Sequence, residues 1–335
     1  MIKTTCTRPL IRAETWETYK TKTGKLAYKT EWLPREFYDQ IINSPTWDWW
    51  NGNKYRKITP VPCGKCLDCQ LSYAAQWATD CMLEKKYWND NECWFLTLTY
   101  SDEFLPVYSY KIENGKEYKG ISLSKKDLQD FWKRVRKHYK CSCKYLAAGE
   151  YGSQTDRPHY HAIVFGIPIE TQNLKYLGNN TNGDSYWTDP QLEKIWGKGQ
   201  IILGKVTFKS VSYTVRYTIK KWKNKNSNMN KIKGRIDEFI CMSQGIGQRY
   251  YEENKEKIIS QGGVLNDKGQ IVMPKRFLKK LEKEDSDILK DLKRKNQKIA
   301  RQNEKIKDQQ TDLNPEQRRI SDEKRKLDSF KNMRR

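Results

Sequence analysis

Two of the three histidines in this chain, His159 and His161, stand one residue apart at the start of an apolar segment. Pro158 precedes them, and the β-branched run 162–165 that follows ends at a glycine, so the segment is predicted to be a buried strand. Alternate residues of a strand point to the same face. The two imidazoles therefore aim at one point, with Tyr160 on the opposite face, and make half of a divalent metal site. The alternative, two partly buried polar residues, fits a histidine-poor chain less well.

A third ligand is expected from a neighbouring strand. Residues 145–151 form a candidate strand that ends just before the turn-rich segment 152–158. If the two strands pair as a hairpin, Glu150 lies close to the histidines. Two imidazoles and one carboxylate leave coordination positions open, as a catalytic metal site requires. In the alternative interpretation, Glu150 is a solvated carboxylate at the end of a strand.

Two tyrosines could supply a nucleophile. If residues 210–222 form a helix, Tyr213, Tyr217 and Lys220 share one face, at positions i, i+4 and i+7. Tyrosines at this spacing usually belong to a core or line a groove, and the β-branched content of the segment would also permit a strand. Beside a metal site that polarises a phosphodiester, however, a tyrosine hydroxyl can attack phosphorus and leave a covalent phosphotyrosine. The covalent link conserves bond energy, so the strand can be rejoined without ATP.

The charge of the chain points to a polyanionic partner. The 335 residues carry a formal net charge of +23. No apolar run approaches the roughly 20 residues that span a bilayer, and no signal peptide opens the chain, so a membrane partner is not expected. Nucleic acid is the natural partner of such a chain. The 12 tryptophans and 20 tyrosines supply core material and ring faces on which bases could stack.

The cysteines indicate metal ligands or reduced thiols in a cytosol. Nine cysteines are an odd number and cluster at short spacings, which is not typical of a disulfide framework. Cys63, Cys66 and Cys69 follow a Cys-x-x-Cys-x-x-Cys pattern and could bind Zn²⁺, with Cys6 or Cys81 as the fourth ligand. On a helix the three would share one face, and thiols that bind no metal are an equal alternative.

The elements around these residues can be outlined from periodicity and capping. Residues 108–120 are predicted to be a loop. Helices are expected from Leu67 to about Trp88, from a cap at Ser124 to about Tyr139, and from Pro190 through Trp196, and strands over 93–100, 145–151, 158–165 and 200–206.

Five segments are expected along the chain. They are an N-terminal extension at 1–60, a cysteine-containing helical segment at 61–90, a core at 91–223, an extension of the core at 224–275, and a charged helical or disordered tail at 276–335, broken near Pro315.

The combination of motifs resembles HUH endonucleases of the rolling-circle initiator type. The matching segments are 95–100, 149–152, 157–161, and the pattern Tyr213-x-x-x-Tyr217-x-x-Lys220. Together with the cysteine segment 63–69, they look like the initiator of gokushovirus-type microviruses, small single-stranded DNA phages. The resemblance covers roughly residues 60–222.

This resemblance implies an α+β fold with a ferredoxin-like, RRM-like HUH core, a central antiparallel sheet flanked by helices. It implies Mg²⁺ or Mn²⁺ at His159, His161 and Glu150, with Tyr213 and Tyr217 as nucleophiles and Lys220 as a further catalytic residue. The implied activity is site-specific nicking and joining of a single-stranded phage origin, with a host helicase and DNA polymerase as partners in the host bacterial cytoplasm.

One residue departs from the pattern of the family. Related initiators often carry lysine directly before the second tyrosine, whereas this chain has Arg216. Arginine keeps the positive charge but cannot act as an acid near neutral pH, so a proton-donating role at this position is in doubt.

A different class of protein is the main alternative. A non-enzymatic basic protein that packages DNA or RNA could use zinc on Cys63, Cys66 and Cys69 to hold a binding module. Such a protein needs neither a His-x-His pair nor a pair of tyrosines, and both features favour the enzyme.

Overall fold

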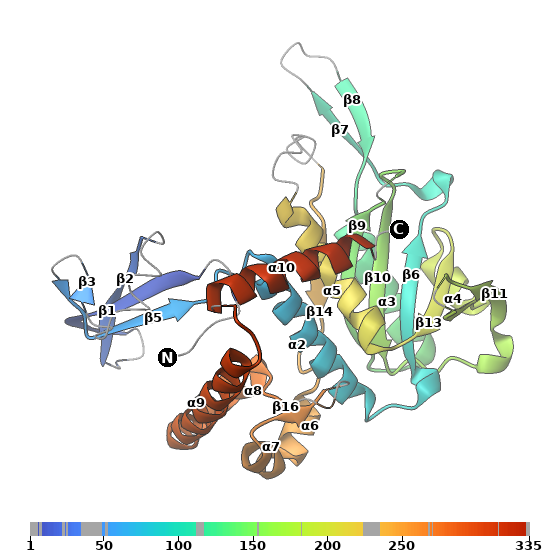
Figure 1. Ribbon diagram of the computed structural model, residues 1–335. Helices are drawn as coiled ribbons and strands as arrows, with labels where there is room; N and C mark the ends of the chain where they lie inside the picture. The colour runs from blue at the N-terminus through green and yellow to red at the C-terminus, as the bar shows by residue number, and fades with distance from the viewer. Residues whose placement is uncertain are drawn as a thin grey trace. The chain divides into compact units, whose positions relative to one another are not determined.

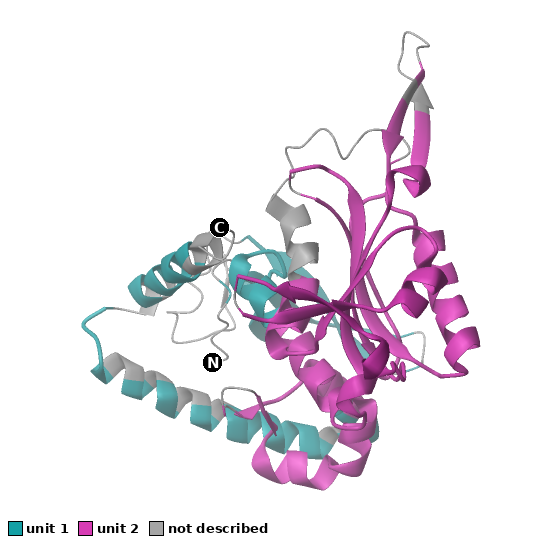
Figure 2. Cartoon of the chain, turned by 90° about the vertical axis from the view of Figure 1, so that its right-hand side faces the viewer, with its two compact units in different colours: residues 1–73, 281–335 teal, residues 74–280 magenta. Residues whose placement is uncertain are grey.

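The computed structural model (Figure 1) describes residues 6, 9–21, 24, 26–34, 49–50, 53–111, 117–152, 154–181, 183–223, 235–266, 269, 271–313 and 315–332. The chain divides into two compact units (Figure 2), one of residues 74–280 and the other of residues 1–73 together with 281–335. The first unit contains the histidine and tyrosine motifs, and the second contains the Cys-x-x-Cys-x-x-Cys motif. The five segments expected from the sequence remain predictions.

A seven-stranded antiparallel sheet organises the unit 74–280. The central strands are almost entirely buried because helices cover both faces of the sheet. This is the mixed α and β fold with a large antiparallel sheet that the sequence predicts, while the ferredoxin-like assignment stays a prediction. In spatial order the strands are β11 (Lys175–Asn179), β12 (Ser185–Thr188), β13 (Ile201–Lys205), β6 (Cys93–Thr99), β10 (Pro158–Phe165), β9 (Lys144–Tyr151) and β14 (Phe239–Met242).

Two pairs of helices pack against this sheet. On one face, the core formed with β6, β10 and β13 includes residues of α3 (Lys125–Tyr139) and α4 (Pro190–Trp196). On the other face, the core includes residues of α2 (Leu67–Lys85) and α5 (Phe208–Lys223). Strand alternation therefore divides β10: Tyr160 belongs to the α3 and α4 face, and Ile163 belongs to the α2 and α5 face.

The helices begin where their capping residues predict. The Ser124 side chain accepts a hydrogen bond from the backbone nitrogen of Asp127, at 3.1 Å, at the start of α3. Asp189 caps α4 in the same way, with Pro190 as its first residue. Both helices were predicted with these caps, and both predictions are confirmed.

The segment predicted to be a loop at 108–120 contains a hairpin, so that prediction is wrong. Strands β7 (Val107–Lys111) and β8 (Glu117–Ile121) pair with Tyr108 opposite Gly120. A Cβ atom at Gly120 would lie 2.8 Å from the ring of Tyr108. The glycine therefore makes room for the cross-strand ring, a role that its usual reading as a breaker hides.

Strand β14 was not predicted, because residues 223–275 show little periodicity. It extends the sheet beside β9, with Phe239 opposite Gly149. A Cβ atom at Gly149 would lie 2.9 Å from the Phe239 ring, so this glycine admits the aromatic side chain. The unit also contains η2 (Asp90–Glu92), η3 (Asp102–Phe104), η4 (Thr171–Asn173), α6 (Gln248–Glu253), α7 (Lys255–Gln261), β15 (Val264–Leu265) and β16 (Ile271–Val272).

The other unit combines a small sheet with the charged C-terminal helices. Strands β2 (Leu26–Leu33), β1 (Leu10–Lys20) and β5 (Lys57–Val61) form an antiparallel sheet in that order. The chain also has β3 (Trp49–Trp50), β4 (Asn53–Lys54), α8 (Lys275–Glu284), α9 (Ser286–Gln309) and α10 (Pro315–Asn332). The break predicted near Pro315 is confirmed. No helix in the described ranges is long and apolar enough to cross a bilayer.

Asp80 gives the fold a pH dependence that can be measured. It lies on α2 with 3% of its surface exposed, and its closest cation is Arg276, whose Nη1 is 3.8 Å from Oδ2. Burial raises the pKa of Asp80 to about 7, although the charge of Arg276 opposes the shift. Between about pH 4 and pH 7 the folded chain therefore holds a proton that the unfolded chain has lost, so stability falls as the pH rises, by on the order of 4 kcal/mol.

We expect Asp80→Asn to raise the melting temperature at pH 8, because the amide cannot ionise. The advantage of the variant should shrink as the pH falls from 8 towards 4, which thermal unfolding at several pH values would measure. A constant difference between the two proteins across this range would show that Asp80 does not titrate as its burial requires.

Candidate metal and nucleophile site

The hairpin of β9 and β10 brings the three predicted metal ligands together. His159 pairs directly with Glu150 across the two strands, and His161 lies on the same face of β10. One ligand atom from each of the three side chains falls within a group whose members are all within 4.8 Å of one another. The hairpin and the proximity of Glu150 predicted from the sequence are confirmed.

Hydrogen bonds orient His159 towards the centre of this group. Its Nδ1 lies 3.1 Å from the carbonyl oxygen of Arg157, which can only accept a hydrogen bond, so Nδ1 carries a proton and donates. In the neutral ring Nε2 then presents a lone pair, and it faces Oε1 of Glu150 at 2.5 Å. Two electron-rich atoms at this separation need a positive charge where they converge. A protonated ring or a bound cation would satisfy the arrangement.

His161 is held in the same manner from the neighbouring strand. Its Nε2 is 3.1 Å from Oε1 of Glu150, and its Nδ1 is 3.0 Å from Oγ1 of Thr97. Thr97 lies opposite His161 in the pairing of β6 with β10. The ring of Phe95 also stacks on that of His161, with centroids 5.6 Å apart and planes inclined by 17°. Thr97 and Phe95 were not recognised as site residues from the sequence, since their role depends on which strand lies next to β10.

Glu150 is well suited to act as an anionic ligand. Its side chain is only 4% exposed, and burial acts to raise its pKa. The hydrogen bonds and charges of His159 and His161 outweigh burial, so the pKa of Glu150 lies below its ordinary value. The carboxylate is therefore ionised at neutral pH, which metal coordination requires.

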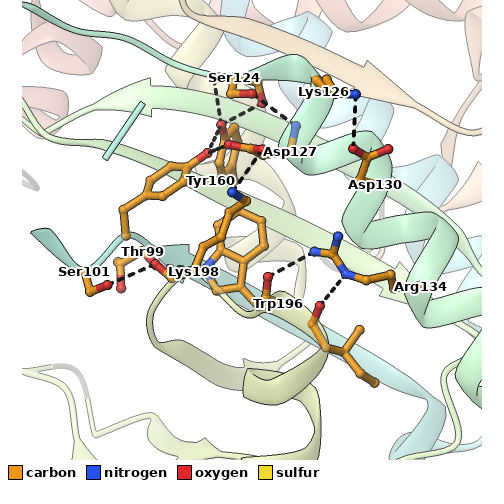
Figure 3. Close-up of polar contacts among 12 residues, drawn as sticks. Thr99, Ser101, Ser124, Lys126, Asp127, Asp130, Arg134, Tyr160, Trp196 and Lys198 are labelled. Carbon is orange, nitrogen blue, oxygen red and sulfur yellow. Dashed lines mark hydrogen bonds and ion pairs between the residues drawn. The ribbon is translucent and has the colours of Figure 1, made fainter. Parts of the chain in front are cut away.

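A polar network behind the strand fixes the position of the histidines. The hydroxyl of Tyr160 accepts a hydrogen bond from the backbone nitrogen of Ser124, at 2.9 Å, and donates to its carbonyl oxygen, at 2.8 Å (Figure 3). Nearby, Trp196 Nε1 donates to the carbonyl oxygen of Thr99 on β6, at 2.9 Å. As predicted, Tyr160 points away from the metal ligands, and its contacts tie β10 to the start of α3.

Tyr213 lies beside the histidines on α5. Its ring centroid is 5.3 Å from that of His161 and 6.2 Å from that of Phe95. The tyrosine is 46% exposed, so it can be reached from solvent. Partial burial, followed by the negative charge of Glu150, raises the pKa of Tyr213 to about 12. The hydroxyl is therefore protonated at neutral pH, and positive charge near Glu150 would make its ionisation easier.

Residues 208–223 form a helix, which settles the choice between helix and strand left open by the β-branched residues. Val211 and Val215 are both fully buried, one turn apart, whereas Tyr213 between them is exposed. Tyr217 and Lys220 lie one and two turns after Tyr213, at spacings that share its face. The side chains of Tyr217, Lys220 and Arg216 lie outside the part of the chain that the structure describes.

The donor set fits a hard or borderline divalent cation. Imidazole nitrogens combined with a carboxylate oxygen suit Mn²⁺, and Mg²⁺ accepts such sites through its preference for carboxylate. Three protein ligands leave room for oxygen atoms of a substrate. The residues present therefore fit the metal that the sequence predicts.

Thr97→Val offers a test of how His161 is oriented. Valine has nearly the shape of threonine but cannot bond to Nδ1 of His161, so it should leave the fold intact. Loss of such a supporting hydrogen bond typically costs about 10- to 100-fold in metal affinity, and we expect a loss of this size for Mn²⁺, measured by calorimetry. Thr99→Val, on the same strand, is the matched control. Unchanged Mn²⁺ affinity in the Thr97 variant would mean that the hydroxyl does not orient the ring.

A second group of potential metal ligands lies in the other unit. Cys6, Cys63, Cys66 and Cys69 bring four sulfur atoms within 4.8 Å of one another. The three thiols of the motif thus gather as predicted, and the fourth is Cys6. Cys81, the other candidate, is fully buried in the core that α2 and α5 form with the sheet.

Comparisons with known proteins place the chain in a family. Residues 93–222 match the family model of the replication-associated protein ORF2. The replication-associated protein ORF2 of Spiroplasma virus 4 is 37% identical over 246 residues, which cover 72% of this chain and 74% of that protein. The replication-associated protein VP4 of Bdellovibrio phage phiMH2K is 30% identical, over 61% of each chain.

A third relative, the replication-associated protein ORF4 of Chlamydia phage 1, is 27% identical over 68% of this chain and 56% of its own length. No solved structure matches the chain. These relatives confirm the resemblance to gokushovirus-type initiators that the motifs indicated. Since the first of them is similar across most of both chains, the protein belongs to the ORF2 family of replication-associated proteins of small phages.

Proposed function

We propose that this protein nicks single-stranded DNA at a phage origin through a tyrosine nucleophile and later rejoins the strand in rolling-circle replication. The observation that carries the proposal is the convergence of Glu150, His159 and His161 beside the exposed ring of Tyr213. The names of its relatives, all replication-associated proteins, agree with this role.

The chemistry assigned to the chain is a transfer of phosphorus from DNA to tyrosine. The hydroxyl oxygen of Tyr213 forms a bond to phosphorus as the bond from phosphorus to the 3′ oxygen breaks. The phenolic proton is lost, the 3′ oxygen takes up a proton, and the 5′ end stays on Tyr213 as a phosphotyrosine. A Mg²⁺ or Mn²⁺ ion on Glu150, His159 and His161 would polarise the phosphodiester and offset the charge that develops.

Rejoining reverses the same step. A 3′ hydroxyl attacks the phosphotyrosine, restores the phosphodiester and returns the proton to the tyrosine oxygen, so no ATP is consumed. Tyr217 is assigned as the second nucleophile, and Lys220 as a positive charge on the same face of α5. The free 3′ end would serve a host DNA polymerase, with a host helicase unwinding ahead of it, in the host cytoplasm.

Affinity for the strand is assigned to the basic surface rather than to the metal ligands. With a net charge of +23, the chain can neutralise several phosphates, and this contribution to binding weakens steeply with salt. Binding and cleavage should therefore respond differently to changes at the site.

Incubation of the full-length protein with an origin oligonucleotide and Mn²⁺ tests the proposal. A denaturing gel should show a covalent protein–DNA adduct and a shortened strand, and an excess of EDTA should abolish both. Binding of DNA without an adduct, whatever metal is present, would overturn the proposal. That outcome would favour a non-enzymatic packaging protein.

A further inference from the structure

The small sheet of the unit 1–73 brings the four thiols of its cysteine cluster together. Strands β1 and β5 pair antiparallel with Leu10 opposite Val61. Cys6 precedes the first of these residues by four positions, and Cys63 follows the second by two, so both thiols lie at the same end of the sheet. Cys66 immediately precedes α2, and Cys69 lies in its first turn. Sulfur atoms from segments almost 60 residues apart in the sequence are thus collected at one point.

The spacing of the sulfur atoms fits a single tetrahedral ion. Sγ of Cys66 lies 3.6 Å from Sγ of Cys6, and all four sulfur atoms are within 4.8 Å of one another. Four thiolates around Zn²⁺, each about 2.3 Å from the metal, stand about 3.8 Å apart. An iron–sulfur cluster would hold its cysteine sulfurs farther apart, because each binds a different iron.

Backbone amides already point at the sulfur atoms. The nitrogens of Lys65 and Cys66 donate to Sγ of Cys63, at 3.3 Å and 3.2 Å. The nitrogen of Cys63 donates to Sγ of Cys6, at 3.3 Å. Gly64 makes this tight turn possible with φ of +71°, a left-handed conformation that side chains disfavour. Such N–H donors stabilise thiolates and are the supporting contacts expected around a metal ion.

The sheet has too small a core to be stable on apolar burial alone. The described part of residues 1–61 buries few hydrophobic side chains, and a sheet of this size usually needs a disulfide or a metal ion in addition. The buried ones are Cys6, Ile11, Ala13, Tyr55 and Ile58. An ion that binds Cys6 and the start of α2 at once would supply the missing free energy of folding.

We propose that Cys6, Cys63, Cys66 and Cys69 bind one Zn²⁺ ion with a structural role. The ion ties the N-terminal strands to the first turn of α2. All four coordination positions are occupied by protein, so the site takes no part in phosphoryl transfer and is independent of the Glu150 and histidine group.

Metal analysis of the full-length protein purified under reducing conditions tests this site. We expect about one zinc per chain, retained in the Glu150→Gln variant because the two sites are separate. Cys6→Ser should lower zinc affinity at least about tenfold, since even the loss of a supporting contact has an effect of that size. Cys141→Ser, a half-buried cysteine outside the cluster, is the matched control and should keep its zinc.

A second measurement covers the case in which Cys6→Ser does not fold. Exchange of Co²⁺ into the wild-type protein should give the intense thiolate charge-transfer absorption of a tetrahedral sulfur site. Removal of zinc with a chelator should expose residues before Leu67 to trypsin, while residues 74–280 remain resistant.

Wild-type protein that contains no zinc, or that contains a stoichiometric amount of iron instead, would overturn the proposal. So would a zinc content unaffected by Cys6→Ser in folded protein. Because these readouts do not involve DNA, failure of the zinc site would leave the proposed nicking activity untouched, and the reverse also holds.

Discussion

His161→Ala is expected to reduce cleavage of an origin oligonucleotide by about 10²- to 10³-fold, the loss typical of removing one group that stabilises developing charge. Affinity for the same single strand should change by less than about threefold, because lysine and arginine contacts with phosphate supply it. His161 is 8% exposed on its side chain and is held between Thr97 and Glu150, so its removal empties one metal position without altering the basic surface. Gel assays for the adduct and fluorescence anisotropy for binding would separate the two effects.

The third histidine of the chain provides the matched control. His138 lies on α3, exposed and in edge contact with the ring of Tyr139, and His138→Ala should cleave and bind as the wild type does. Addition of Mn²⁺ at high concentration should partly restore the His161 variant, because Mn²⁺ binds imidazole sites more tightly than Mg²⁺. Equal losses of binding and cleavage in a folded His161 variant would instead mean that the histidine has a structural role.

The parts of this site that could be predicted from sequence are those set by local periodicity. His159 and His161 share a face because a strand alternates, and Glu150 joins them because a short turn-rich segment closes a hairpin. Both inferences need only neighbouring residues. The capped helices α3 and α4 were predicted for the same reason, since capping depends on side chains within one turn.

The parts that could not be predicted depend on long-range pairing. Thr97 reaches His161 only because β6, from a segment about 60 residues earlier, lies next to β10. Cys6 was preferred to Cys81 because β1 pairs with β5, a choice that no local pattern contains. The edge strand β14 is short, and its main partner is the space left by Gly149, which a sequence shows only as a missing side chain.

The division of labour between Tyr213 and Tyr217 is the second large effect that we expect. One tyrosine suffices to nick, but a replication cycle must cut the regenerated origin while the first 5′ end is still attached. A second hydroxyl one helical turn away, roughly 6 Å along the same face, can act at the same site. Tyr213→Phe and Tyr217→Phe should therefore each retain some nicking, whereas the double variant should form no adduct at all.

Each single variant should also fail to release closed circles, because alternation between the two hydroxyls is lost. Mass spectrometry of trapped wild-type adduct should find DNA on either residue, and Tyr160→Phe, on the opposite face of β10, is the control that should keep both tyrosines in use. If DNA is found on one tyrosine only and the other variant completes replication, that other residue is reduced to a packing role. Tyr217 is the one that we expect to lose its role in that event, because Arg216 beside it already departs from the family pattern, whereas Tyr213 contacts the ring of His161 directly.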